Sequence, residues 1–193
     1  MKPNSIILMD PRQVNHIFGP EQLRQIRDMT ELLHPPMSGD EALSRPYLLE
    51  KVDFIFSGWG MCPVDEGCLR IAKNLKAIFY GAGTVRGFMS DALLDSDIPV
   101  TTAYAANAVP VAEFTFAQII LALKKALYFT RISHENHRWE RERSEPEAIA
   151  GCFGSTVGLV SLGMIGTKVL ALLQHLDVKI KVFDIVRNDE LAA

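Results

Sequence analysis

The sequence lacks an excess of positive charge and lacks cysteines in pairs. Its formal net charge is -3 at pH 7, and its Lys and Arg residues are scattered, so no basic surface is expected to attract a polyanion. The three cysteines, Cys62, Cys68 and Cys152, match neither the CxxC spacing of zinc ligands nor an even-numbered disulfide framework. We therefore expect no nucleic acid partner, no metal site and reduced structural thiols.

Long apolar runs are also scarce. The apolar run at residues 6–9 is too short for the core of a signal peptide, and no small-residue cleavage site follows it. The longest strongly apolar stretch, residues 114–123, is about half of the length needed to cross a bilayer and runs into Lys124. These features predict a cytoplasmic protein with no membrane partner.

The pattern that is present is typical of a parallel sheet covered by helices. Of the 193 residues, 48% are hydrophobic and 22% are charged, which suits one or two soluble domains. Short apolar runs alternate with helical patterns over the first hundred residues. Strands are expected at 6–9, 52–56, 75–80 and 100–102, and helices at 21–29, 64–73 and 88–94. The sequence predicts one compact α/β lobe over residues 1–104.

Two of the expected strands end in loops that contain glycine. One loop is Ser57-Gly58-Trp59-Gly60, and the other is Gly81-Ala82-Gly83-Thr84. In open α/β sheets, ligands bind at the carboxyl ends of the strands, where loops diverge and leave backbone N–H groups free. Each loop alone is equally compatible with a plain turn. Their equivalent positions favour a binding site.

A long apolar helix is expected to follow the lobe. Pro110 and Glu113 are helix start signals, and the apolar pattern then continues to about residue 130. Apolar residues surround most of this helix, so it needs cover from a second lobe or a second subunit. We expect a homodimer built on residues 111–127 and a polar arm that carries Trp139.

Residues 131–150 are the most polar part of the sequence. His134 and His137 lie three residues apart and in principle could share a metal ion. No third ligand is visible nearby, and protein zinc sites need three or four ligands. A solvated connection is therefore the favoured interpretation.

The strongest motif is a glycine-rich turn between a strand and a helix. Residues 156–167 read TVGLVSLGMIGT, and an apolar helix and a strand ending in Asp184 follow. Strand, turn, helix, strand and terminal acid are the first βαβ unit of a Rossmann-type dinucleotide-binding domain. Residues 105–193 are thus predicted to form a partial NAD-binding domain, although a turn of this kind can also bind nothing.

Each position of the turn has a physical role. Gly163 lets the backbone approach the pyrophosphate at the helix N-terminus, and Gly166 lets helix and strand pack closely. Ser161 replaces the first glycine of the usual motif, which costs backbone freedom without blocking the phosphate. Asp184 accepts hydrogen bonds from the adenosine ribose and repels a 2′-phosphate, so NAD is preferred over NADP.

The order of these parts resembles the D-isomer-specific 2-hydroxyacid dehydrogenases. The likeness rests on the Asn74 to Gly83 segment, on Asn107 through Glu113, and on Gly154 into the glycine turn. It implies a flavodoxin-like substrate lobe before the cofactor domain. It also implies an NAD-dependent transfer of hydride between a small 2-keto acid and a D-2-hydroxy acid.

The resemblance also implies roles for particular residues. The loops with Ala82-Gly83 and with Trp59-Gly60 would receive the substrate, the first through its backbone amides. Asn107 would lie close to substrate and nicotinamide, and Val111 would pack against the nicotinamide ring. The pyrophosphate would be covered by Met164 and Ile165. Two departures are Val85-Arg86, where an acidic residue is frequent, and Met164, where arginine is frequent.

No catalytic residue is assigned on this sequence. In the resembling family, the catalytic arginine, the acidic residue and the acid/base histidine lie beyond the second strand of the cofactor domain. We therefore expect a fragment or truncated product that is inactive alone. The alternative is a non-catalytic NAD-sensing or dimerisation module derived from that family.

Overall fold

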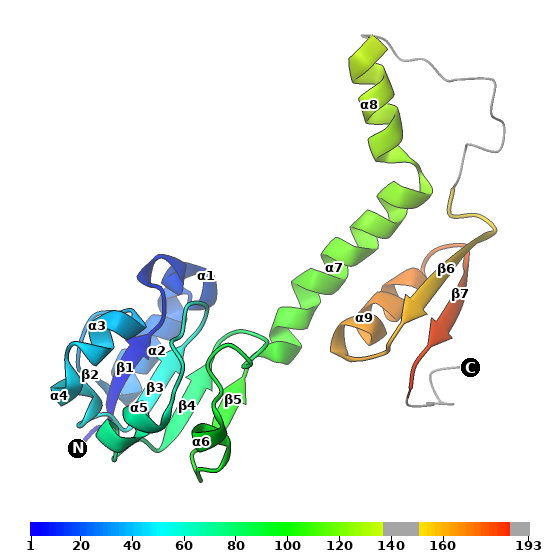
Figure 1. Ribbon diagram of the computed structural model, residues 1–193. Helices are drawn as coiled ribbons and strands as arrows, with labels where there is room; N and C mark the ends of the chain where they lie inside the picture. The colour runs from blue at the N-terminus through cyan, green and yellow to red at the C-terminus, as the bar shows by residue number, and fades with distance from the viewer. Residues whose placement is uncertain (137–150, 186–193) are drawn as a thin grey trace. The chain divides into compact units, whose positions relative to one another are not determined.

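Two compact units make up the structure, Met1–Tyr104 and Ala105–Ala193 (Figure 1). It is a computed structural model that describes residues 1–136 and 151–185. Both units are built from parallel strands and helices. The α/β fold class expected from the sequence is confirmed.

The first unit contains a five-stranded parallel sheet in the order β2-β1-β3-β4-β5. This is the flavodoxin-like strand order, as predicted. The strands are β1 (Asn4–Leu8), β2 (Glu31–Leu32), β3 (Phe54–Ser57), β4 (Ala77–Tyr80) and β5 (Val100–Thr102). The two-residue edge strand β2 was not expected from the sequence, because too short a run carries no period-2 signal.

Short helices connect these strands. They are η1 (Pro11–Gln13), α1 (Val14–Ile17), α2 (Pro20–Met29), α3 (Gly39–Leu43), α4 (Pro46–Leu49), α5 (Glu66–Ile71) and α6 (Asp91–Leu94). Several begin at capping side chains, which satisfy backbone N–H groups that a helix leaves unpaired. The Asp65 carboxylate accepts from the Cys68 N–H at 2.8 Å, and Ser90 Oγ accepts from the Leu93 N–H at 3.1 Å.

The main core lies in the first unit. Ile6, Ile55 and Ile78, at the centres of β1, β3 and β4, are fully buried there with side chains from the covering helices. The buried runs in the sequence are thus central strands covered on both faces, as parallel sheets require. All three cysteines are free, and Cys68 is buried in this core.

The second unit contains a two-stranded parallel sheet of β6 (Ser155–Val160) and β7 (Val178–Phe183), joined by α9 (Met164–Leu173). The register runs from Ser155↔Val178 to Val160↔Phe183. Its small core joins Val157 of β6, Val169 and Leu173 of α9, and Ala112 of α7 (Tyr104–Leu123).

The long apolar helix differs from the sequence expectation at both ends. α7 begins at Tyr104, so Pro110 lies inside it rather than in its first turn; Ala105 and Ala106 are strong helix formers that extend it backward. The helix ends at Leu123, and α8 (Ala126–Asn136) follows after a break at Lys125, whose φ is 50°. A left-handed residue and cations are typical of helix C-termini.

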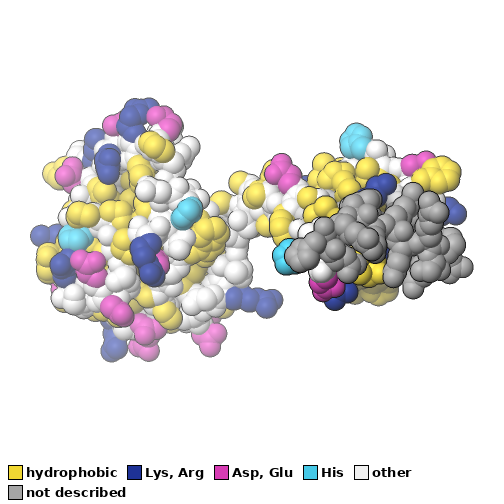
Figure 2. All heavy atoms as spheres, turned by 90° about the horizontal axis from the view of Figure 1, so that it is seen from above, with side chains coloured by type: hydrophobic (Ala, Val, Ile, Leu, Met, Phe, Trp, Pro, Cys, Tyr) yellow, Lys and Arg dark blue, Asp and Glu magenta, His cyan; other side chains and the backbone are white. Residues whose placement is uncertain are grey.

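One side of α7 packs against the core of its unit, and the other side carries exposed apolar residues. Exposed hydrophobic side chains, drawn in yellow, are visible on this unit in Figure 2. With 20 residues and a mean hydropathy of 1.5, α7 is long enough and apolar enough to cross a membrane. The apolar stretch expected from the sequence, residues 114–123, was shorter than this helix. A core helix in a soluble protein passes the same test, so the finding is weak evidence for a membrane.

Candidate functional site

Three loops meet at the carboxyl edge of the first sheet because β1, β3 and β4 are parallel neighbours. The loop after β1 carries Asp10, the loop after β3 carries Trp59 and Gly60, and the loop after β4 carries residues 81–84. The two glycine loops expected from the sequence therefore lie at one edge of one sheet. Their role in substrate binding stays a prediction.

The loop after β3 is locked against the loop after β1. The Asp10 N–H donates to the Trp59 carbonyl at 3.1 Å. Gly60 has a φ of 84°, and a Cβ at that position would lie 2.7 Å from Asp10 Cβ. Glycine is required here for both reasons, whereas the Trp59 side chain is left exposed. This contact holds Trp59 at the edge of the sheet.

The loop after β4 presents several unpaired backbone donors. The Gly81 N–H extends the sheet by donating to the Ser57 carbonyl at 2.8 Å, and the Ala103 N–H donates to the Ala82 carbonyl at 3.1 Å. Within the described residues, the N–H groups of Ala82, Gly83 and Thr84 have no hydrogen-bond partner. Such a row of donors suits a carboxylate, which accepts hydrogen bonds only.

Sequence reasoning missed two neighbours of these loops. The Asp10 carboxylate accepts from the Arg12 guanidinium, with Nη2–Oδ2 at 2.8 Å, and this bond lowers the pKa of Asp10. Ile17 lies under Gly81, where an added Cβ would meet Ile17 Cγ2 at 2.4 Å. The Asp-Pro-Arg sequence directly after an apolar strand was the available signal for the first pair.

In the second unit, the glycine turn connects β6 to α9. Gly163 is the N-cap of α9, and a Cβ there would meet no atom within 4 Å. A Cβ on Gly166 would lie 2.2 Å from the Ser161 carbonyl oxygen. Gly163 thus leaves space beside the helix N-terminus, and Gly166 allows the close packing predicted for it.

Met164 and Ile165 form the exposed first turn of α9. The helix has no side-chain cap hydrogen bond at Gly163, so its first N–H groups are available to an anion. This geometry fits the diphosphate of a dinucleotide. The assignment of both residues to the pyrophosphate stays a prediction.

Asp184 lies directly after β7 and faces the same turn. Its carboxylate accepts from the Leu162 N–H at 2.5 Å. The residue is half-buried, so the acid expected to bind ribose also fixes the backbone of the glycine turn. Sequence spacing predicted the position of Asp184 but not this contact.

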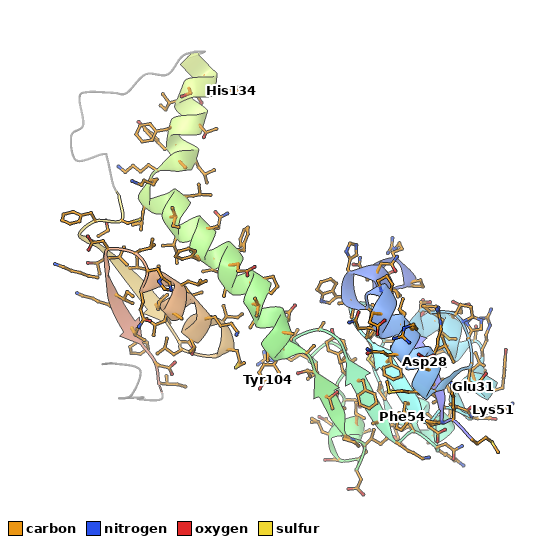
Figure 3. All side chains as sticks on the ribbon, turned by 180° about the vertical axis from the view of Figure 1, so that it is seen from behind. Asp28, Glu31, Lys51, Phe54, Tyr104 and His134 are labelled. Carbon is orange, nitrogen blue, oxygen red and sulfur yellow. The ribbon has the colours of Figure 1, made fainter. Side chains whose placement is uncertain are left out.

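The remaining predicted residues lie elsewhere in the second unit. Asn107 and Val111 lie on α7, three and seven residues after Tyr104, which Figure 3 labels. Asn107 is half-buried and Val111 is exposed. His134 lies near the end of α8 (Figure 3), while His137 and Trp139 lie outside the described residues. Among the described residues, no group of three metal-ligating side chains is found.

These features define an α/β protein with a flavodoxin-like lobe and a dinucleotide-binding βαβ unit. Residues 117–193 match the family described as D-isomer specific 2-hydroxyacid dehydrogenase, NAD binding domain. A curated D-lactate/D-glycerate dehydrogenase from Pediococcus acidilactici is 27% identical over 103 residues, which are 53% of this chain and 30% of that protein.

Solved structures share the fold. The NAD-complexed D-isomer specific 2-hydroxyacid dehydrogenase from Lactobacillus delbrueckii ssp. bulgaricus aligns with a TM-score of 0.71 and 18% identity, over 97% of this chain and 55% of that one. D-Lactate dehydrogenase from Aquifex aeolicus, complexed with NAD and lactic acid, gives a TM-score of 0.70 and 20% identity, over 98% and 54%.

The family model and the curated relative indicate the D-isomer specific 2-hydroxyacid dehydrogenase family, in agreement with the resemblance found in the sequence. The solved structures show the shared fold. The matched family model is that of an NAD-binding domain, in agreement with the predicted cofactor. The chain spans little more than half of the solved chains that it matches.

Proposed function

We propose that this chain supplies the substrate lobe and the first cofactor-binding half of an NAD-dependent 2-hydroxyacid dehydrogenase. The reaction would transfer hydride between NAD(H) and a small 2-keto or D-2-hydroxy acid. The observation that carries the proposal is the βαβ unit in which open space at Gly163, close packing at Gly166 and the Asp184 carboxylate surround one turn. When bound, the nicotinamide group supplies the hydride chemistry.

The residues of this chain would bind and orient. The N-terminus of α9 would hold the diphosphate, since it combines unpaired N–H groups with a partial positive charge. The backbone N–H groups of Ala82, Gly83 and Thr84 would donate hydrogen bonds to the substrate carboxylate. Trp59 and Gly60, at the same sheet edge, would limit the size of the substrate. We assign no proton donor to residues 1–193.

Cofactor choice is tested with Asp184→Asn and Asp184→Ala. The asparagine retains an oxygen that can accept from the Leu162 N–H but removes the charge, so the preference for NAD over NADP should shrink while the turn remains folded. Alanine should weaken NAD binding as well. Calorimetric titration of the protein with NAD and NADP measures both effects. Asp177→Ala, a change of an exposed acid just before β7, is the matched control and should alter neither affinity.

The substrate site is tested by NMR titration with pyruvate. The amide signals of Ala82, Gly83 and Thr84 should shift and saturate, whereas that of the nearby exposed Gly87 should not. Equal shifts at all four amides would indicate nonspecific binding and contradict the assignment.

A parallel assay measures NADH oxidation with a panel of 2-keto acids. We expect no turnover, because we assign no proton donor to residues 1–193 and general acid catalysis contributes on the order of 10²–10⁴-fold to the rate.

A second candidate function is a non-catalytic NAD-binding and dimerisation module. The exposed apolar side of α7, with Val111, Phe114 and Leu121, favours association. We infer that two copies pair through this side. Phe114→Glu should shift the sedimentation of a dimer toward the monomer. Leu94→Glu, at an equally exposed site (65% for each residue) in the first unit, should leave it unchanged, and a monomeric wild-type protein would contradict the pairing.

A further inference from the structure

Ser161 adopts a conformation that its residue type avoids. Its φ is 76°, and among the described non-glycine residues only Lys125, at 50°, shares the left-handed region. Lys125 lies between two helices, where a left-handed residue commonly terminates the first one. Ser161 follows a strand instead. There the Cβ atom crowds the following carbonyl group, and glycine would relieve the strain.

The surroundings of Ser161 point to the adenosine end of a bound dinucleotide. The Ser161 N–H donates to the Phe183 carbonyl at 2.7 Å, and the next N–H, of Leu162, donates to the Asp184 carboxylate at 2.5 Å. Ser161 and Asp184 therefore continue the β6–β7 pairing as neighbours, at a strand spacing of about 4.8 Å. Ser161 is exposed, and within the described residues its hydroxyl makes no hydrogen bond.

We propose that the Ser161 hydroxyl binds the adenosine ribose of NAD together with Asp184; this inference rests on the proposed function. A ribose 2′-hydroxyl both donates and accepts, so it can donate to the Asp184 carboxylate while it accepts from the Ser161 hydroxyl. Glycine at this position offers no such donor. The strained backbone is retained because the side chain that causes it contacts the cofactor, as is common where strain occurs at binding sites.

The proposal separates stability from affinity. If serine were only a tolerated replacement of glycine, Ser161→Gly would stabilise the fold and leave nucleotide affinity unchanged or higher. On our proposal, the same variant gains stability and loses affinity. Ser161→Ala retains the Cβ but lacks the hydroxyl, so it should lose affinity without the gain in stability.

The experiment is calorimetric titration of the 193-residue protein and its variants with NAD, ADP and 2′-deoxyADP, alongside thermal unfolding. Ser161→Gly should raise the melting temperature by about 4 °C. It should weaken ADP binding by about 3–10-fold, the effect of one hydrogen bond, and should leave 2′-deoxyADP binding nearly unchanged. The control Lys125→Gly relieves the other left-handed residue. It should raise the melting temperature and leave all affinities unchanged.

Each contrary outcome has a distinct meaning. If Ser161→Gly binds ADP as tightly as the wild-type protein does, or more tightly, the hydroxyl has no role in binding and the inference is wrong. If the variant weakens ADP and 2′-deoxyADP equally, the 2′-hydroxyl is not the partner and the assignment is overturned. If the wild-type protein binds neither NAD nor ADP, the proposed cofactor function fails, and the inference fails with it.

Discussion

The two units use the same strand-helix-strand order but cover their strands very differently. In β1, β3 and β4 of the first unit, the central apolar side chains are fully buried. In β6 and β7 of the second unit, Val160, Val182 and Phe183 are exposed, although these three side chains are just as apolar. The comparison shows that burial depends on how many neighbours a strand has and not on its hydrophobicity alone.

The largest effect should come from truncating one side chain in each unit. Ile55→Ala removes a fully buried side chain from β3 and should lower the free energy of unfolding of the first unit by about 2–5 kcal/mol. Phe183→Ala removes a larger side chain from β7, yet Phe183 is 65% exposed. Its cost should stay within about 0.5 kcal/mol.

Urea unfolding followed by resolved NMR signals from each unit measures these two costs separately. Leu173 is fully buried in α9, so Leu173→Ala tests whether the second unit has a packed core. This substitution should lower the free energy of unfolding of the second unit by about 2–5 kcal/mol. If Phe183→Ala costs nearly as much stability as Ile55→Ala, β7 is covered in solution and the contrast between the two units is wrong.

A second test compares two glycines in the same turn. A Cβ on Gly166 would overlap the Ser161 carbonyl oxygen at 2.2 Å, so Gly166→Ala must displace backbone. It should destabilise the second unit by about 1–3 kcal/mol, the usual cost of overpacking, and abolish NAD binding. Gly163→Ala places its methyl group in open space. The fold should tolerate it, with NAD affinity alone reduced, and calorimetry of both variants distinguishes the two roles.

The sequence predicted the elements that have a strong local signal. Strand β5 and helix α2 lie within a residue of their expected limits, and the glycine turn was found from residue types and spacing. Contacts between distant segments carry no such signal. Neither the lock of Gly60 on Asp10 nor the bond from the Leu162 N–H to Asp184 follows from local pattern, since each depends on strand register.

The break at Lys125, between α7 and α8, was missed for a related reason. The apolar pattern continues through it into α8, so periodicity alone predicts one helix. The turn predicted to bind the cofactor was easier to find than the sheet edge predicted to bind the substrate. A glycine turn is local in sequence, whereas that sheet edge joins three loops from residues about 10, 59 and 82.

Alkaline pH should affect the first unit more than the second. Burial raises the pKa of the Cys68 thiol from its usual value of 9.0, near which the unfolded chain titrates, to about 11. Above that lower value, the unfolded state loses its proton first, so stability falls as pH rises toward 11. The loss should approach about 2–3 kcal/mol. Cys68→Ala should reduce this pH dependence and leave the part that comes from Cys62 and Tyr80, whose pKa values are also raised by burial in the first unit. Cys152→Ala, in the second unit, should leave it unchanged.

A smaller effect of pH should come from an ion pair at the amino ends of β3 and β4. The Asp53 carboxylate accepts from Lys76 Nζ at 2.7 Å and from the Asn4 N–H at 2.8 Å. The hydrogen bond from Lys76, followed by that from Asn4, lowers the pKa of Asp53. Because the folded pKa is depressed, the stabilisation is present above the unfolded pKa and is lost as pH falls through the folded value.

Asp53→Asn should lower the free energy of unfolding by only about 1 kcal/mol at pH 7, since Lys76 is largely exposed. The cost should be much smaller in acid, where the Asp53 carboxylate is protonated. A double-mutant cycle with Lys76→Met, measured by urea unfolding at both pH values, separates the ion pair from the Asn4 bond. If the coupling between Asp53 and Lys76 is the same at acid and neutral pH, the pair does not stabilise the sheet through charge.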